Sequence, residues 1–387
     1  MRGPGWTITV GARGNMETEN VRSEGGAVKS LPLSERHRDL GANFGLRDGW
    51  EVVLSYGAPG HEYSQVRNHV GLVDLSHCGI IAVSGSEAEG FLNGLVTNDV
   101  KTLGKGQGMQ AAFLTPHGKV TALCRILGRG DSYLIINDPQ THEKVYKYLF
   151  PLSYAGDFKV EDVTTRYCLL SIQGPKSLLV MKEVCFEPVP SMDEHHWRDS
   201  VIAGHTVMVV KATHSPESGY DILVPVDGVT DVWDFILLKG GFHGIKPFGL
   251  EVLDILRVEA GIPAYGVDID ENNMMLETGL SGAVSFTKGC YKGQEAVAMA
   301  TYRGHVSKKL SGLFIEGDVV PTRGARVLSQ DRDVGSVTSA IRSEGLGRVI
   351  AMALIKYRFF DPGTALEVQS GRDLLKASVT EMPFRKG

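Results

Sequence analysis

The sequence has few cysteines and no arrangement of them that predicts crosslinking or zinc binding. Its 387 residues include five cysteines, an odd number, and no two of them are spaced as a CxxC pair. A disulfide framework or a compact zinc site is therefore not expected, and no metal-ligating residues are predicted. This cysteine pattern is typical of a protein from a reducing compartment.

Long apolar runs and an excess of charge of one sign are also missing. No apolar run reaches the roughly 18 residues that a membrane span requires, and the opening MRGPGWTITV is a poor secretory signal. Lys and Arg total 40 against 45 Asp and Glu, a net charge of −5, which argues against binding nucleic acid or an anionic membrane through bulk charge. We therefore expect a cytoplasmic protein with neither nucleic acid nor membrane as a partner.

Two widespread catalytic signatures are absent as well. The glycines of LGKGQG (103–108) lack the Lys-Ser/Thr ending of a phosphate-binding loop. The chain also has no GxSxG nucleophile elbow. The sequence therefore argues against P-loop NTPases and ordinary serine hydrolases.

The composition is that of a globular protein, with 42% hydrophobic and 22% charged residues. Residues 1–38 are predicted to be a flexible tail, because they lack an apolar period that could offset the entropy of ordering. Over 39–304, strands interleave with helices without an unbroken βαβ rhythm, which predicts an α+β region of two interleaved subdomains. Residues 305–387 contain short strands between Gly, Asp or Pro turns, which predicts a small antiparallel β-barrel.

Individual elements of the α+β region are predicted from periodicity and turn residues. Strands are expected over 80–85, 132–138, 167–174, 205–213 and 220–225. Helices are expected over 86–96, 141–150 and 229–241.

The segment LVTNDVKTL (95–103) places an Asn-Asp pair after an amphipathic stretch. Both side chains can bond nearby backbone groups as a turn or cap. Alternatively, Asp99 is a carboxylate aimed into a pocket, where it accepts a hydrogen bond from a substrate amine or takes part in proton transfer. The sequence leaves both interpretations open.

Glu217 lies in the turn THSPESG (213–219), just before a predicted strand. A solvated turn acid is the commoner case for glutamate. The alternative is that Glu217 binds a guanidine-like edge. A carboxylate is a pair of acceptors, and a 2-aminopyrimidinone ring offers two parallel N–H donors.

Asp254 and Arg257 lie in an amphipathic segment that ends at Gly261 and Pro263, a helix stop. Their spacing of three residues permits a local ion pair on one helix face. The alternative is that Arg257 points inward and holds a carboxylate or a ring carbonyl.

The stretch KGCYKGQE (288–295) is the most informative in the chain. It places Cys290 between two glycines and two lysines, just before a predicted helix. Positive potential near a helix N-terminus favours a thiolate, so Cys290 is a candidate reactive group. A small buried cysteine in a Gly-rich turn is an equally acceptable interpretation.

Six segments, in order along the chain, resemble the folate-binding superfamily that contains the glycine-cleavage T-protein (aminomethyltransferase) and the YgfZ-type proteins. They are VGLVDLSHCG (70–79), LVTNDV (95–100), SIQGPKS (171–177), ESGYDILVP (217–225), LRVEAGIPAYGVDID (256–270) and GSVTSAIRS (335–343). The resemblance spans about Gly49 to Val379 and places the family's functional residues on Asp99, Glu217 and Arg257. One departure is Ser215-Pro216-Glu217, where a T-protein reads TGE, so the approach of backbone to a pterin ring can differ.

Within the superfamily, KGCYKGQE is similar to the YgfZ signature KGCYxGQE, and FLTPHGKV (113–120) also resembles the YgfZ form. The resemblance implies a cloverleaf of three domains around a central channel. In that channel tetrahydrofolate would be bound by Asp99, Glu217 and Arg257, with Asp99 and Cys290 as catalytic residues.

The resemblance further implies folate-dependent support of the assembly or repair of iron–sulfur enzymes, which would then be client partners. Two alternatives remain. One is a folate-dependent one-carbon transferase, either an aminomethyltransferase or a demethylase. The other is a non-catalytic remnant of the fold that acts as an interaction module.

Overall fold

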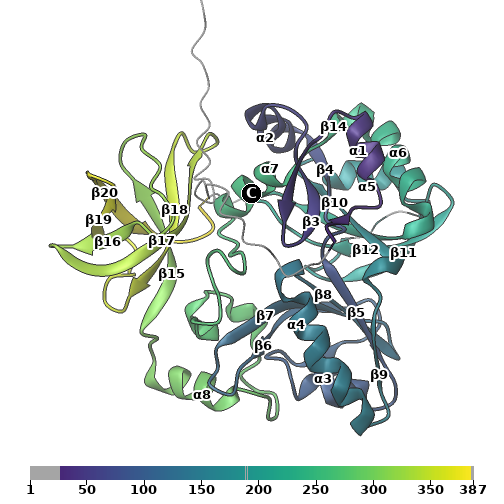
Figure 1. The fold of residues 1–387 in the computed structure, drawn as a ribbon, viewed down its shortest axis with the longest axis horizontal. Helices are drawn as coiled ribbons and strands as arrows, with labels where there is room; N and C mark the ends of the chain where they lie inside the picture. Colours follow the sequence, from purple (N-terminus) through teal and green to yellow (C-terminus); the bar gives the residue numbers. More distant parts are fainter. Residues whose placement is uncertain (1–26, 188, 190, 385–387) are drawn as a thin grey trace, which may run out of the picture.

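The computed structural model describes residues 27–384 apart from 188 and 190, and Figure 1 shows them arranged in three parts. The green to yellow barrel lies on the left, and two α+β parts lie one above the other on the right. No helix in this described part of the chain is long and apolar enough to cross a membrane.

The upper α+β part is built on a six-stranded sheet. Its strands, in sheet order, are β11 (Trp197–Ile202), β12 (His205–Lys211), β13 (Gly219–Pro225), β10 (Tyr167–Gln173), β4 (Val70–Asp74) and β14 (Ile245–Pro247). Neighbouring strands are antiparallel except β14 and β4. Helices α5 (Ser177–Val184) and α6 (Val229–Gly240) pack against it and bury an apolar core that includes Trp233.

The lower α+β part is inserted between β4 and β10 of the upper sheet. Its five strands, in sheet order, are β6 (Gly108–Leu114), β7 (Val120–Gly128), β8 (Ser132–Asn137), β5 (Gly79–Ser84) and β9 (Lys159–Asp162). Helices α3 (Ala88–Asn93) and α4 (Pro139–Leu149) contribute to a second apolar core. All pairings in this sheet are antiparallel.

The predicted strands and helices of this region are present, with shifted ends. The five strands correspond to β5, β8, β10, β12 and β13, and the helices to α3, α4 and α6. Helix α3 is shorter than the predicted 86–96 and has Gly94 as its C-cap. Helix α4 begins earlier than predicted, at Pro139, because the side chain of Asp138 caps it.

The predicted tail is wrong over its last residues. Strand β1 (Lys29–Ser30) pairs with β3 (Trp50–Ser55), which also pairs with β2 (Asn43–Arg47), and helix α1 (Ser34–Asp39) follows β1. The sequence carried too weak an apolar period to reveal this. His37, inside α1, is fully buried and bonds Asp74 of β4 and the hydroxyl of Tyr56, and Leu33 is buried in the apolar core, so long-range contacts hold the segment. Residues 1–26 lie outside the described part of the chain.

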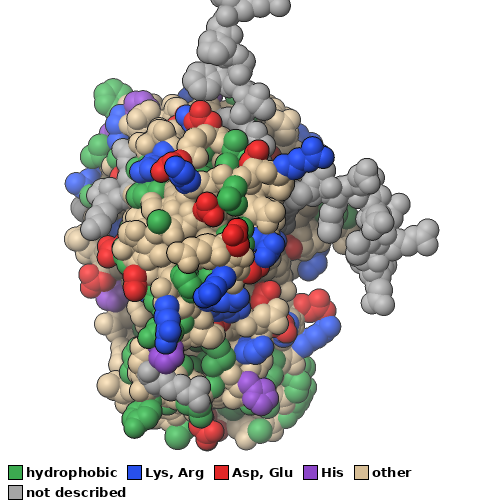
Figure 2. All heavy atoms as spheres, turned by 90° about the vertical axis from the view of Figure 1, so that its left-hand side faces the viewer, with side chains coloured by type: hydrophobic (Ala, Val, Ile, Leu, Met, Phe, Trp, Pro, Cys, Tyr) green, Lys and Arg blue, Asp and Glu red, His purple; other side chains and the backbone are tan. Residues whose placement is uncertain are grey.

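The C-terminal part is a closed antiparallel barrel, as predicted. Its strands, in order, are β15 (Lys308–Ile315), β18 (Arg348–Lys356), β17 (Arg332–Ser343), β16 (Arg326–Ser329), β19 (Ala365–Ser370) and β20 (Asp373–Thr380). Small and branched apolar residues fill its interior. Figure 2 views the barrel side of the molecule, where Lys, Arg, Asp and Glu side chains are interspersed. The structure thus confirms an α+β protein with a C-terminal antiparallel barrel.

The described part of the chain also contains three further helices and several short 3-10 turns. The helices are α2 (Pro59–Asn68), α7 (Leu250–Glu259) and α8 (Gln294–Arg303). The 3-10 turns are η1 (Val100–Thr102), η2 (Phe150–Ala155), η3 (Thr164–Arg166), η4 (Val226–Gly228), η5 (Gly241–His243), η6 (Met275–Glu277) and η7 (Ser281–Ala283).

Helix α7 joins the upper α+β part to the barrel, since it contacts α2 and β3 on one side and the barrel strand β17 on the other. Its N-terminal cap, Gly249, is pressed against the end of β3. A Cβ atom at this position would lie 2.0 Å from the carbonyl oxygen of Leu54. The absence of a side chain at Gly249 therefore sets how closely α7 approaches the sheet.

We expect Gly249→Ala to destabilise the protein by about 1–3 kcal/mol, because the added methyl group must displace the β3 backbone. Urea unfolding measures the change. Gly282→Ala is the control, since a Cβ there meets nothing within 4 Å. Equal unfolding free energies for the two variants would show that the approach of α7 is not a constraint.

Candidate functional site

Three segments that the sequence analysis singled out meet at one place. Lys292 N–H donates to the carbonyl of Gly94 (3.1 Å), and Ser285 N–H donates to that of Thr97 (3.0 Å). We call this place the Lys288 junction, and it consists of residues 93–99, 115–118 and 285–293. Since these segments are remote in sequence, only the fold brings them together.

Two glycines let the backbones cross closely at the junction. Gly118 and Gly293 both have positive φ angles, of 72° and 83°. A Cβ on Gly293 would lie 2.6 Å from the carbonyl oxygen of Thr115, and one on Gly118 would lie 2.7 Å from the Cβ of Ala296. Both the conformation and the space therefore require glycine, and α8 begins directly after the crossing.

Lys288 lies at the centre of the junction with its side chain almost fully buried. Its Nζ donates to the carbonyl oxygens of Asn93 (2.7 Å), Val96 (2.9 Å) and Asn98 (2.6 Å). Burial lowers its pKa to about 8, although Asp99 opposes this effect. Hydrogen bonds to a charged donor contribute about 1.5–3 kcal/mol each, so this lysine is a strong link.

Asp99 is a half-buried residue that caps η1. Its carboxylate accepts a bond from Lys101 N–H (3.3 Å). Its own N–H donates to Oδ1 of Asn98 (3.0 Å), and Nδ2 of Asn98 donates to the carbonyls of Gln110 and Gly282. The cap interpretation is therefore observed, and the same contacts fix the backbone from which Asp99 projects.

Cys290 is exposed and lies four residues before the first residue of α8. The alternative of a small buried cysteine is therefore wrong. The other cysteines are buried or half-buried. Burial raises the pKa of Cys78, Cys124 and Cys168 to about 12.

Glu217 belongs to a different cluster. It pairs with Nη1 of Arg67 at 2.8 Å, and Nε of Arg67 lies 3.8 Å from Glu259. Glu259 is fully buried and accepts a bond from the hydroxyl of Tyr63 (2.6 Å) and one from Ser343 of the barrel. Glu217 is thus not a free solvated acid. Through Arg67 it belongs to a polar network that links α2, α7 and the barrel.

Arg257 forms the predicted local ion pair and also reaches a buried carboxylate of the protein itself. Its Nε donates to Asp254 (3.1 Å), three residues earlier, and its Nη1 donates to the buried Asp268 (2.7 Å). Further bonds go to Ile262 O (3.3 Å) and to Oγ of Ser339 (3.1 Å), so most of the five guanidinium donors are in use. Burial alone would lower the pKa of Arg257, but Asp268 and Asp254 hold it above its usual value.

A cavity of about 340 Å³ lies beside Arg257, between the β2–β3 hairpin, α7 and β17. Apolar side chains line part of this cavity. Charged side chains of both signs line the rest, namely Arg47, Arg257, Arg323, Glu251 and Asp254. Asp99 and Glu217 are not among its lining residues. The structure therefore gives the three predicted binding residues different partners.

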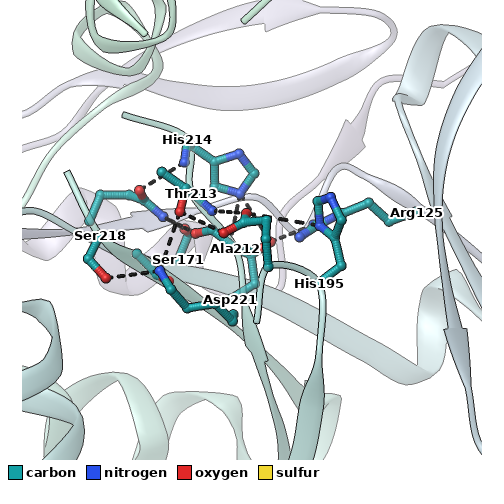
Figure 3. A network of polar contacts seen from close by, with 12 residues as sticks. Arg125, Ser171, His195, Ala212, Thr213, His214, Ser218 and Asp221 are labelled. Atoms are coloured by element: carbon teal, nitrogen blue, oxygen red, sulfur yellow. Dashed lines mark hydrogen bonds and ion pairs between the residues drawn. The ribbon is translucent and has the colours of Figure 1, made fainter. Parts of the chain in front are cut away.

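A buried carboxylate that the sequence analysis missed is Asp221, in the middle of β13. Figure 3 shows its network, which Arg125 enters from strand β7 of the other sheet. Nε2 of His214 donates to its two oxygens, at 3.0 and 3.1 Å. Burial alone would raise the pKa of Asp221, but His214 and Arg125 hold it well below its usual range.

This network contains polar atoms that have no hydrogen bond among the described residues. Nη1 of Arg125 and Nδ1 of His195 are buried without a hydrogen bond. Burial, followed by the charge of Arg125, lowers the pKa of His195 to about 4. The group therefore combines an ionised carboxylate, a neutral histidine and a guanidinium donor, which is a set able to hold a polar ligand or move a proton.

A sequence signal for Asp221 exists. In GYDILVP an acid interrupts a strand that is otherwise apolar, and in VTALCRILG an arginine does the same. Charges at such positions are expected to be paired when the strands are buried. A search of the described residues finds no group of three or more His, Cys, Asp or Glu that could hold a metal ion.

Comparison with known proteins identifies, over most of the chain, the family that the sequence motifs resemble. The GCVT N-terminal domain matches residues 33–288, and the glycine cleavage T-protein C-terminal barrel domain matches residues 308–386. The aminomethyltransferase of Caldanaerobacter subterraneus subsp. tengcongensis is 32% identical over 93% of this chain and 96% of its own length. That of Bacillus subtilis is 28% identical over 93% of this chain and 98% of its own.

A solved structure has the same fold. It is the glycine cleavage system aminomethyltransferase T from Bartonella henselae, with a TM-score of 0.85, 23% identity, and coverage of 93% of this chain and 99% of that one.

Acid should destabilise the protein through two half-buried histidines. Burial lowers the pKa of both His77 and His195 to about 4, below the 6.5 of an unfolded chain. Between these values the unfolded state binds more protons, so stability falls as pH falls from 6.5 towards 4, by about 2 kcal/mol per histidine at pH 5. Urea unfolding at pH 7 and pH 5 measures this loss.

His195→Gln should lose less stability between pH 7 and pH 5 than the parent protein. His61→Gln, a change at an exposed histidine, is the control and should behave as the parent. An unchanged pH dependence in His195→Gln would show that this histidine is protonated alike in the folded and unfolded states.

Proposed function

The chain belongs to the glycine cleavage T-protein family, and on that basis we propose that it is a folate-dependent one-carbon transferase of the aminomethyltransferase type. The observation that carries this proposal is that the match to relatives extends over nearly the whole length of both chains. Relatives named aminomethyltransferase match nearly the whole chain at 28–32% identity, and the chain spans nearly their whole length. This favours the transferase alternative of the sequence analysis over an iron–sulfur role.

In this proposal tetrahydrofolate is the ligand, and Asp99 is the residue closest to the chemistry. Asp99 would orient a folate nitrogen and assist proton movement while that nitrogen attacks the one-carbon donor. The contacts of Asn98 support this role, since they fix the Asp99 backbone before any ligand binds. A group held in this way loses little entropy on binding.

Glu217 and Arg257 would contribute less directly than the sequence analysis predicts. One carboxylate oxygen of Glu217 is held by Arg67, so the other oxygen remains to accept a ring N–H. Arg257 is largely occupied by Asp268 and Asp254, and it would act mainly by shaping the wall of its cavity.

A second candidate function is a YgfZ-type role in the assembly or repair of iron–sulfur enzymes. The observation that favours it is the exposed Cys290, carried on a loop that Lys288 holds in place. Here the thiol would be the reactive group, and iron–sulfur proteins would be clients. A third interpretation, an interaction module without ligand, requires that the protein binds no folate.

We expect Asp99→Asn to lower turnover about 100-fold or more, because the amide cannot accept a proton. Folate affinity should change by less than about threefold, since the amide still forms hydrogen bonds. Anaerobic calorimetry with tetrahydrofolate measures affinity, and donor-dependent formation of methylene- or methyl-tetrahydrofolate measures turnover. Asp131→Asn, at an exposed loop position, is the control.

Equal turnover of Asp99→Asn and parent would remove Asp99 from the chemistry. If the parent protein binds no tetrahydrofolate at all, the interaction module remains.

We expect Cys290→Ser to bind tetrahydrofolate as the parent does, because the thiol is exposed and no buried contact is lost. In cells that lack the parent protein, the second candidate predicts that this variant fails to restore the activity of iron–sulfur enzymes. The folate titration of the same variant is the control for an intact pocket. Full restoration would exclude a role for the thiol.

A further inference from the structure

The amine of Lys288 is bound differently from that of any ordinary surface lysine. It is buried, and its three partners are main-chain carbonyl oxygens within one short turn, residues 93–98. An ammonium group has three N–H donors and no acceptor, so three carbonyls satisfy it completely. The side chain therefore has no capacity left for a ligand, and its role is to hold backbone.

The two backbone segments that Lys288 joins are those that carry Asp99 and Cys290. The carbonyl of Asn98 belongs to the peptide group that leads into Asp99, and it receives the shortest of the three bonds, 2.6 Å. Lys288 itself lies two residues before Cys290. One ammonium group therefore sets the position of the turn with the carboxylate relative to the loop with the thiol.

We propose that Lys288 is a positioning residue that fixes the Asp99 turn for the transfer reaction, an inference that rests on the proposed function. Its three hydrogen bonds require one nitrogen atom with donors that point at three different carbonyl oxygens, so a positive charge without this geometry would not replace them. Other contacts nearby, such as the hydrogen bond from Thr97 Oγ1 to Ala283 O, do not involve the carbonyls of Asn93, Val96 and Asn98.

A matched control exists four residues away in the same loop. Lys292 is also a lysine of the KGCYKGQE motif, but its amine lies over the ring of Tyr148, 4.2 Å from the ring centroid. It is only half-buried. Replacing Lys292 removes a charge from the loop without removing a bond to the Asp99 turn.

The first experiment is amide hydrogen exchange, followed by mass spectrometry, on the parent, Lys288→Met and Lys292→Met. We expect exchange over residues 93–99 and 285–293 to accelerate tenfold or more in Lys288→Met and to stay within twofold of the parent in Lys292→Met. Unchanged exchange in Lys288→Met would overturn the proposal.

Lys288→Arg keeps the charge and guards against a variant that fails to fold. Because the donors of a planar guanidinium cannot converge on three carbonyls around one nitrogen, exchange should still accelerate. Parent-like exchange in this variant would show that charge is sufficient and would also overturn the proposal.

The second experiment separates positioning from general stability. Lys288→Met should lower kcat about tenfold or more with little change in the folate KM, and the double variant with Asp99→Asn should be no slower than Asp99→Asn alone, within twofold. Independent losses that multiply would mean that Lys288 does not act through Asp99. If the parent protein binds no folate, the proposed function fails, while the exchange data still decide whether Lys288 joins the two segments.

Discussion

A buried charge must be paired, and this constraint decides how the parts of the molecule are joined. Asp221 of β13 lies between two sheets and is neutralised by Arg125, which comes from the other sheet. Asp268 is neutralised by Arg257 of α7, and it also accepts bonds from Thr338 and Ser339 of the barrel. Breaking such a pair leaves an uncompensated charge at a cost of about 3–5 kcal/mol, so each pair holds its two parts in a single arrangement.

The sequence predicted the fold class well because periodicity and turn residues report local structure. The barrel and the main strands and helices of the α+β region could all be read in this way. The structure of residues 29–39 could not, because it depends on long-range contacts, such as those of His37 with Asp74 and of β1 with β3, that leave no periodic pattern. The partner of Glu217, Arg67, could likewise not be predicted, since it lies on the distant helix α2, whereas the cap at Asp99 and the Asp254–Arg257 pair are local and were foreseen.

The candidate site also contains residues whose roles the sequence did not reveal. Sequence reasoning placed a reactive group at Cys290, because the residue lies between two lysines and just before a predicted helix. It passed over Lys288 two residues earlier, because a lysine beside glycines is typical of a solvated loop. Its three acceptors lie about 190 residues away, and burial of its amine follows from the fold alone. Asp221 carried a usable signal, an acid in an apolar strand, but its partner Arg125 lies 96 positions earlier.

The insertion of one sheet within another affects how the chain acquires its structure during synthesis. Strand β4 ends at Asp74, and its antiparallel neighbour β10 begins only at Tyr167. At about 5–20 residues per second the ribosome needs several seconds to deliver the missing partner. Throughout that interval both edges of β4 are unpaired, since its other neighbour, β14, is made later still, and unpaired apolar edges are a hazard for association with other chains. The inserted five-stranded unit is complete once β9 has been made, before β10 is available, so it can fold first.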